Sequence, residues 1–263
     1  MTGLAVIAGH AAESSDQEAI HDAINPLGKL EVQTLRNDDL LACVGQHANA
    51  PCAAASFDVN DSAVCLLAGD VVNSDDLDWA AVHSALASGD KHPDCLRKLR
   101  GSFGIVVIDR RRKRLWVVTD PSAWQSVMTC RTDRGFIVST SIAAILRTLP
   151  DPAKPNVDWV FESLYFNHGS GLTTPVEGVE RLPPGTLTEI DLQSFEVTRS
   201  TLQPRPTAHK PLINGQDAVD EAVETFRKVV PRYFPDDTPV TIGISEGLDC
   251  RTVLASLPDE KIK

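Results

Sequence analysis

Short apolar runs separated by polar turn residues occupy most of the first 200 positions. Runs of four to eight residues that are rich in β-branched side chains are typical of strands. They predict strands over residues 4–7, 40–45, 53–58 and 63–69. Four further runs, SFGIVVID, RLWVVTD, SVMTCR and GFIVST, are divided by the polar clusters RRRK, PSAWQ and TDRG. This alternation predicts an antiparallel meander.

Helical spacing of apolar residues appears in four segments of the same region. It predicts helices over residues 76–86, 96–99, 142–149 and 158–166. The last of these follows the connector DPAKPN, which cannot continue a helix because proline lacks a backbone N–H. Farther on, TLTEIDL and FEVTRS predict a hairpin.

A proline-rich stretch, TLQPRPTAHKPLING, then interrupts the pattern and predicts a domain boundary. We therefore expect a first domain over residues 1–200, a linker over residues 201–213 and the start of a second domain over residues 214–263. In the second region Asn214 is positioned to cap an amphipathic helix that ends at Pro231.

After this helix the pattern changes to strand, loop and helix. Residues 239–244 (PVTIGI) predict a strand, residues 245–251 (SEGLDCR) a small-residue loop and residues 252–257 a helix. This order is the opening of a nucleotide-binding α/β unit. One strand cannot complete a parallel sheet, so we expect either that the chain is truncated relative to a working protein or that the remainder of such a domain is supplied elsewhere.

Composition excludes several classes of protein. The chain has 263 residues, of which 42% are apolar and 23% are charged, and it has no apolar run long enough to cross a bilayer and no basic leader. We therefore expect a cytoplasmic protein without a membrane partner. Six cysteines without CxxC or CxxH spacing indicate neither a metal site nor a disulfide framework.

The net charge of −11 argues against a nucleic-acid partner, because phosphate backbones repel an acidic surface. The one basic run, Arg110–Arg114, lies between two predicted strands. It is better interpreted as a solvated hairpin turn.

The loop SEGLDCR resembles the SGGxDS pyrophosphate loop of the ATP-pyrophosphatase domains of asparagine synthetases. Residues in step with that motif are Ser245, Gly247, Leu248 and Asp249, whereas Glu246 replaces a glycine and Cys250 a serine. The resemblance implies ATP and Mg²⁺ as cofactors. Backbone N–H groups of the loop and the N-terminus of the following helix would face the phosphates.

Two further blocks carry the same resemblance. The run from LRGSFGIVVID to STSIAAIL is similar to the family's "L-x-G-x-F-A-F", "RDP" and "F-x-S-E-I-x-A-L" segments, and FNHGSGLTTPVEGVERLPPG to its segment ending in "L-P-P-G". Residues in step in the second block are Thr174, Gly178, Leu182, Pro183, Pro184 and Gly185. The resemblance implies an α+β chain: a four-layer αββα sandwich of the N-terminal-nucleophile (Ntn) hydrolase type, followed by the beginning of an α/β ATP-pyrophosphatase domain.

The glutaminase residues of that family are replaced here. Its nucleophile, a cysteine at the second position, is Thr2, and its oxyanion-binding asparagine corresponds to Ala68, followed by Gly69. Its glutamine-binding arginine falls near His47 and Ala48, and its acidic substrate-binding residue has no counterpart. Because these groups act as a unit, the resemblance implies a pseudo-glutaminase without confident catalytic residues.

Relatives with an inactive glutaminase domain include β-lactam synthetases and lactam-forming cyclases. The first hypothesis is therefore an ATP-dependent amide or lactam ligase that joins a small-molecule or peptide carboxylate to an amine. Alternatives are a scaffold or substrate-docking domain for a partner ATP-binding chain, a Thr2-dependent amidohydrolase, and an asparagine synthase that uses free ammonia. A homodimer or a partner chain that completes the ATP domain is the expected assembly.

Overall fold

The computed structural model describes residues 3–9, 13–47, 56–60, 62–73, 78–133, 135–202, 214–234 and 241–258. The chain divides into two compact units, Met1–Arg205 and Pro206–Lys263. The predicted linker, residues 201–213, lies almost wholly outside the described residues.

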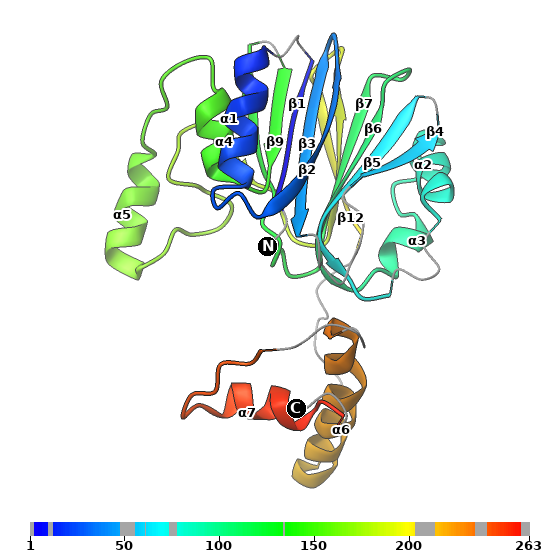
Figure 1. Ribbon diagram of the computed structural model, residues 1–263, viewed down its shortest axis with the longest axis vertical. Helices are drawn as coiled ribbons and strands as arrows, with labels where there is room; N and C mark the ends of the chain where they lie inside the picture. The colour runs from blue at the N-terminus through cyan, green and yellow to red at the C-terminus, as the bar shows by residue number, and fades with distance from the viewer. Residues whose placement is uncertain are drawn as a thin grey trace. The chain divides into compact units, whose positions relative to one another are not determined.

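The first unit is built on two antiparallel sheets (Figure 1). Among the described residues each sheet has six strands. The first sheet has the order β10 (Val179–Arg181), β8 (Met128–Thr132), β9 (Gly135–Ser139), β1 (Gly3–Ala8), β3 (Leu40–His47) and β2 (Leu30–Asn37). The second has the order β12 (Val197–Thr201), β11 (Thr186–Asp191), β7 (Arg114–Thr119), β6 (Gly101–Asp109), β5 (Ala63–Val71) and β4 (Ser56–Asn60).

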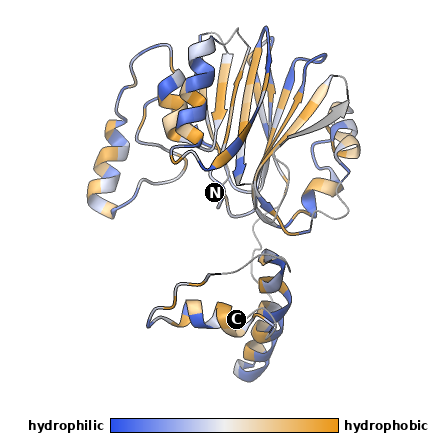
Figure 2. Ribbon diagram, in the orientation of Figure 1, coloured by the Kyte–Doolittle hydropathy of each residue, from blue (hydrophilic) through white to orange (hydrophobic). Residues whose placement is uncertain are grey.

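Three apolar clusters show how the layers stack. The central cluster joins residues of both sheets, for example Leu4, Val106 and Val138, so the sheets pack face to face. The outer face of the first sheet packs with Ile20 of α1 (Ser14–Ile24) and Ile145 of α4 (Ile142–Thr148). Helices α2 (Trp79–Ala87) and α3 (Asp94–Arg97) cover the second sheet. The predicted four-layer αββα sandwich is confirmed, and Figure 2 shows its apolar strands inside the layers.

Helix α5 (Val157–Phe166) differs from the other helices of this unit because none of its residues is buried. Its segment is anchored by a bridge between Pro155 and Val176 and by Glu162, whose Oε2 accepts a hydrogen bond from the Ser170 N–H at 2.7 Å. The predicted helix is confirmed, but most of its apolar side chains, for example Phe161, Leu164 and Tyr165, are exposed in this unit.

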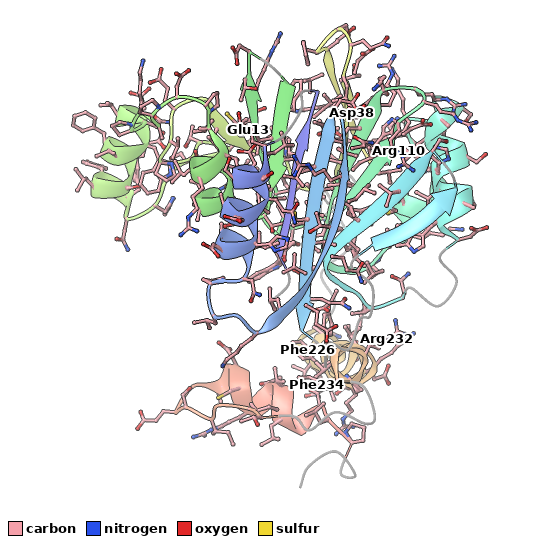
Figure 3. The ribbon with its side chains drawn as sticks, turned by 45° about the horizontal axis from the view of Figure 1, so that its top comes forward. Glu13, Asp38, Arg110, Phe226, Arg232 and Phe234 are labelled. Atoms are coloured by element: carbon pink, nitrogen blue, oxygen red, sulfur yellow. The ribbon has the colours of Figure 1, made fainter. Side chains whose placement is uncertain are left out.

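The basic run lies in the turn between β6 and β7, as predicted, at the same end of the sandwich as the β2–β3 turn; Figure 3 labels Arg110 and Asp38 there. Lys113 forms an ion pair with Asp39, and Arg114 forms one with Asp191 at 2.9 Å. The turn therefore has specific acidic partners in addition to its contact with solvent.

The second unit contains α6 (Gly215–Val229), the 3₁₀ helix η1 (Val230–Tyr233) and α7 (Leu248–Ala255). Asn214 is the N-cap residue of α6, as predicted, although its side chain makes no capping hydrogen bond. Residues 241–244 form no strand, so the strand prediction over residues 239–244 is wrong in its described part. A strand needs a hydrogen-bonded neighbour, and the described part of this unit has no other strand.

Most secondary-structure predictions for the first unit are confirmed, with ends shifted by a few residues. The four strands predicted as one antiparallel meander are β6–β9, but β6 and β7 pair in the second sheet and β8 and β9 pair in the first. The prediction of a single meander is therefore wrong, because the chain crosses from one sheet to the other between β7 and β8. The predicted hairpin corresponds to β11 and β12. Three elements were not predicted: α1, β2 and β10. Among the described helices, none combines the length and the apolar character that crossing a bilayer requires.

Candidate functional site

The residues of the candidate glutaminase site predicted from the sequence lie in or next to β1, β3 and β5. Gly3 begins β1, and Thr2, at the position of the nucleophile, lies outside the described residues. His47 ends β3, but its side chain and Ala48 also lie outside the described part. Of the three candidate positions, the structure therefore describes the side chains only of the one on β5, which is Ala68 with Gly69.

Ala68 occupies the interior of the sandwich. Its side chain is fully buried and belongs to the central cluster that also contains Leu4 of β1. A methyl group cannot donate a hydrogen bond, so this position offers no side-chain group that could stabilise an oxyanion. The methyl contributes to packing between the two sheets instead.

Gly69 is held in a conformation and an environment that only glycine fits. Its φ is +93°, and a Cβ atom there would lie 2.1 Å from the carbonyl oxygen of Ser102 on β6. Gly101 mirrors it with a φ of +138° and a virtual Cβ 2.0 Å from the carbonyl oxygen of Asp70. The two backbones approach closely at this end of the β5–β6 pair, so its shape depends on both glycines.

Asn73 follows β5 and ties the next loop to the segment before β6. Its amide nitrogen donates to the carbonyl oxygen of Lys98 at 3.0 Å, and its Oδ1 accepts from the N–H of Arg100 at 2.7 Å. The Val72 N–H also donates to the Arg100 carbonyl at 2.9 Å. Both ends of the Asn73 amide are thus used in local structure.

The carboxylate of Asp120, in the DP segment after β7, is fully buried and accepts four backbone hydrogen bonds. Oδ1 accepts from Ser122 at 2.9 Å and Trp124 at 3.2 Å. Oδ2 accepts from Phe103 at 3.3 Å and Gln125 at 3.0 Å. Asp120 therefore fixes the β7–β8 loop against β6.

The same residue connects the motif blocks found in the sequence. Its backbone N–H donates to the Phe103 carbonyl at 3.1 Å, and its carbonyl accepts from the Gly185 N–H at 2.8 Å. Beside it, the Thr119 hydroxyl donates to the carbonyl oxygen of Pro183 at 2.6 Å. The spacing of the blocks LRGSFG, VTDPSAW and RLPPG thus reflects one hydrogen-bonded junction.

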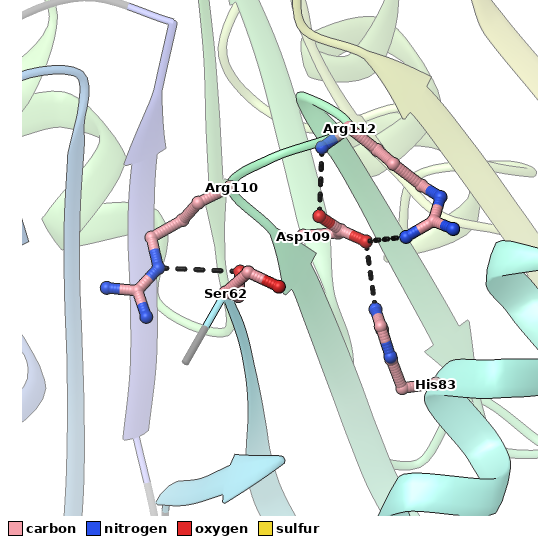
Figure 4. Close-up of polar contacts among 5 residues, drawn as sticks. All are labelled: Ser62, His83, Asp109, Arg110 and Arg112. Carbon is pink, nitrogen blue, oxygen red and sulfur yellow. Dashed lines mark hydrogen bonds and ion pairs between the residues drawn. The ribbon is translucent and has the colours of Figure 1, made fainter. Parts of the chain in front are cut away.

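A buried polar network that was not predicted joins α2 to the β6–β7 turn (Figure 4). His83 Nε2 lies 2.9 Å from Oδ2 of the fully buried Asp109, which also accepts from the Arg112 guanidinium at 3.0 Å. Oδ1 of Asp109 accepts from the Arg112 N–H at 2.9 Å. Burial by itself would raise the pKa of Asp109, but these hydrogen bonds outweigh it and hold the pKa below its ordinary value.

The residues of the expected phosphate loop lie in the second unit. The Ser245 N–H donates to the Cys250 sulfur at 3.2 Å, and the Gly247 N–H donates to the Ser245 hydroxyl at 3.2 Å. The Cys250 thiol lies 3.5 Å from the carbonyl oxygen of Gly247. These contacts fold the loop onto the first turn of α7. Hydrogen bonds from the Ser245 N–H and then from its hydroxyl lower the pKa of the Cys250 thiol.

The N-terminus of α7 lacks a side-chain cap. Gly247 is the N-cap residue, with φ −66° and ψ 153°, and it has no side chain to accept hydrogen bonds from Leu248 or Asp249. The side chain of Glu246, which replaces the usual glycine, is exposed. The helix start can therefore offer backbone N–H groups to an anion, and the carboxylate of Glu246 has access to water.

The region that contains several of these motifs is similar to a known protein family. Residues 61–147 match the family model for a glutamine amidotransferase domain. The match covers about a third of the chain and lies within the αββα sandwich, so this part of the chain is similar to a glutamine amidotransferase domain. No curated protein sequence matches the chain significantly.

Two solved structures resemble the chain more distantly. The glutamine phosphoribosylpyrophosphate amidotransferase from B. subtilis complexed with ADP and GMP has 10% identity and a TM-score of 0.45 over 77% of this chain and 49% of its own. A structure described as the allosteric regulatory enzyme of purine biosynthesis has 10% identity and a TM-score of 0.44 over 96% of this chain and 62% of its own. The chain thus spans half to three fifths of the length of these proteins.

We predict that Gly69→Ala destabilises the first unit more than Gly89→Ala. Gly89 has a similar φ of +85°, but a Cβ there would meet no atom within 4 Å. The difference in the free energy of unfolding should therefore be about 1–3 kcal/mol, the usual cost of overpacking. Chemical denaturation of both variants measures it, and equal losses would contradict the close approach of β5 and β6.

We predict that Asp109→Asn lowers the free energy of unfolding at pH 7 by about 3 kcal/mol, because it leaves the buried His83–Asp109–Arg112 network without its acceptor charge. Since the folded-state pKa of Asp109 is lowered, its stabilisation is present above the unfolded pKa of about 3.9 and is lost as pH falls through the folded value. The difference between wild type and variant should therefore shrink below about pH 4.

Denaturation curves between pH 3 and pH 8 test this dependence. Asp94→Asn is the matched control, since the Asp94–Arg97 pair is exposed and should contribute little at any pH. A difference between wild type and Asp109→Asn that did not change with pH would argue against a charged Asp109 in the folded protein.

Proposed function

We propose that this chain is part of an ATP-dependent amide or lactam ligase whose glutaminase-type domain is inactive. In the proposed reaction, a carboxylate oxygen attacks the α-phosphorus of ATP and releases pyrophosphate. An amine then attacks the activated carboxyl carbon, displaces AMP and loses a proton, which leaves an amide. Inactivity, ATP use and the substrates are all parts of the proposal.

The observation that carries the proposal is the buried methyl of Ala68. Loss of a single oxyanion donor typically lowers kcat by about 10²–10³. Thr2 stands at the nucleophile position, and a hydroxyl is a weaker nucleophile than a thiolate unless a base activates it. A domain that combines both changes is expected to keep its fold while losing glutamine hydrolysis.

The N-terminus of α7 supports the nucleotide part of the proposal. The exposed loop of small residues and the uncapped N–H groups of Leu248 and Asp249 suit phosphate oxygens, which helix N-termini bind through N–H groups and the helix dipole. Exposed carboxylates of Glu246 and Asp249 are of the ligand type that Mg²⁺ prefers. Among the described residues, no group of three or more His, Cys, Asp or Glu could hold a metal ion, so Mg²⁺ would arrive with the nucleotide.

A scaffold for a partner ATP-binding chain is the second candidate. Apolar residues of α6 are exposed in this unit, with Val219 at 53% and Phe226 at 43%, and such a face favours burial against another protein element. A Thr2-dependent amidohydrolase and an asparagine synthase that uses free ammonia remain further alternatives. For each of these candidates we propose a cytoplasmic location.

The first experiment measures release of glutamate from glutamine by the full chain. We expect the wild type and Thr2→Ala to give the same background rate, because neither has a side-chain oxyanion donor at position 68. Glutamate release well above background that disappears in Thr2→Ala would identify an active amidohydrolase and overturn the inactive assignment.

The second experiment measures binding of Mg–ATP to the full chain by calorimetry. Leu248→Pro removes one N–H at the first position of α7, where proline is tolerated, and the extended ψ of Gly247 suits a residue before proline. Loss of one charge-assisted hydrogen bond should weaken binding about tenfold or more. Leu248→Ala, which keeps the N–H, should bind like the wild type.

These two variants separate the candidate functions. Equal affinity of Leu248→Pro and Leu248→Ala would place nucleotide binding away from the loop. No binding by the wild type would favour the scaffold.

A further inference from the structure

Two threonine hydroxyls are buried in the first unit without a hydrogen-bond partner among the described residues. They are Oγ1 of Thr129 on β8 and Oγ1 of Thr188 on β11, and the two side chains are 6% and 0% exposed. A buried hydroxyl without a partner costs about 1–3 kcal/mol, so each one calls for a physical account.

Both hydroxyls point into the space between the sheets. On β8 the neighbours of Thr129, Met128 and Cys130, pack in the outer cluster with α1 and α4. On β11 Leu187 packs in the outer cluster with α2 and α3. Because side chains alternate along a strand, Thr129 and Thr188 face inward.

An ion pair shows that the two threonines face the same region. Thr129 pairs across β8 and β10 with Glu180, and Thr188 pairs across β11 and β12 with Arg199. Cross-strand partners lie on one face of a sheet. The Arg199 guanidinium forms an ion pair with the Glu180 carboxylate, so the two rows meet across the sandwich.

The gap between the hydroxyls can be judged from sheet spacing. Packed sheets lie about 10 Å apart, and a threonine hydroxyl extends only one bond beyond Cβ, so two hydroxyls that face each other directly across the sandwich would be about 5 Å apart. This span matches two hydrogen bonds of about 2.8 Å each through one water molecule. The two threonines have Val117 on β7 and Val138 on β9 as cross-strand partners, and both valines belong to the central cluster, so each hydroxyl has an apolar neighbour on one side.

We propose that Thr129, Thr188 and Glu180 form a binding site for one buried water molecule that bridges the two sheets behind the Glu180–Arg199 ion pair. Buried water in proteins typically makes about three hydrogen bonds, and the two hydroxyls and the carboxylate supply three partners. The site is separate from Ala68 and Gly69 and does not depend on the proposed function. It links β8 to β11 at the edge formed by β10 and β12.

Thr→Val substitutions test the site, because valine keeps the shape of threonine and removes the hydroxyl. With a bridging water, Thr129→Val and Thr188→Val each leave the water and the opposite hydroxyl short of a partner. Each single variant should therefore raise the equilibrium constant of unfolding about tenfold. The double variant removes both hydroxyls together with the water, and it should be no less stable than either single variant.

If the two hydroxyls do not share a water molecule, we expect the opposite result. Each substitution would then leave the protein equally stable or more stable, and the two effects would multiply, which would overturn the proposal. Thr198→Val on β12, an exposed position, is the control for a Thr→Val change in a strand and should alter the unfolding constant less than twofold.

A second measurement uses the unmodified full chain. A high-resolution crystal structure should show density for one water molecule within hydrogen-bond distance of both Oγ1 atoms. A structure in which side chains of Glu180 or Arg199 bond directly to the hydroxyls, or in which nothing lies between them, would also overturn the proposal.

Discussion

Face-to-face packing of two antiparallel sheets is the constraint on which the first unit depends. Each sheet has an apolar inner face that excludes water by packing on the other sheet, and an apolar outer face that must be covered by helices. Two sheets therefore give four layers. Inward positions carry the central cluster of Leu4, Val106 and Val138. A polar group at such a position must find a partner inside the sandwich, as the Glu180–Arg199 ion pair does at its edge.

The sequence allowed the central strands to be predicted because they are apolar and bounded by turn residues. Some elements that bury little were not found, although α5 and α6 were predicted from their apolar spacing. Helix α1 buries only Ile20 and Ile24 among eleven residues, and β2 lies at a sheet edge with most of its residues partly or fully exposed. The segment before the expected phosphate loop shows the reverse case: it has strand-like composition, yet residues 241–244 pair with no strand in the part of this unit that the structure describes. Pairing is a property of the fold, and local composition does not specify it.

The polar contacts likewise divide into those that the sequence predicted and those that it did not. The DP segment after β7 stood out in the sequence because it resembles a segment of the asparagine synthetase family. The four hydrogen bonds that the Asp120 carboxylate accepts from backbone N–H groups could not be predicted from it. His83 and Asp109 are 26 positions apart, and no local pattern connects them. Thr129 and Thr188 can be assigned to the inner faces of the two sheets only once strand order and register are known. Such contacts join distant segments, so they need the fold before they can be recognised.

At the candidate glutaminase site, Ala68 and Gly69 differ in what they say about activity. Gly69 fits the family pattern, but β5 and β6 need a glycine there whether or not the domain hydrolyses anything, since a Cβ would meet the Ser102 carbonyl. Its presence therefore says little about catalysis. Ala68 is different, because an apolar cluster does not require a hydrogen-bond donor and would gain nothing from one. Only an oxyanion would require a donor at this position, so the methyl of Ala68 is informative where Gly69 is not.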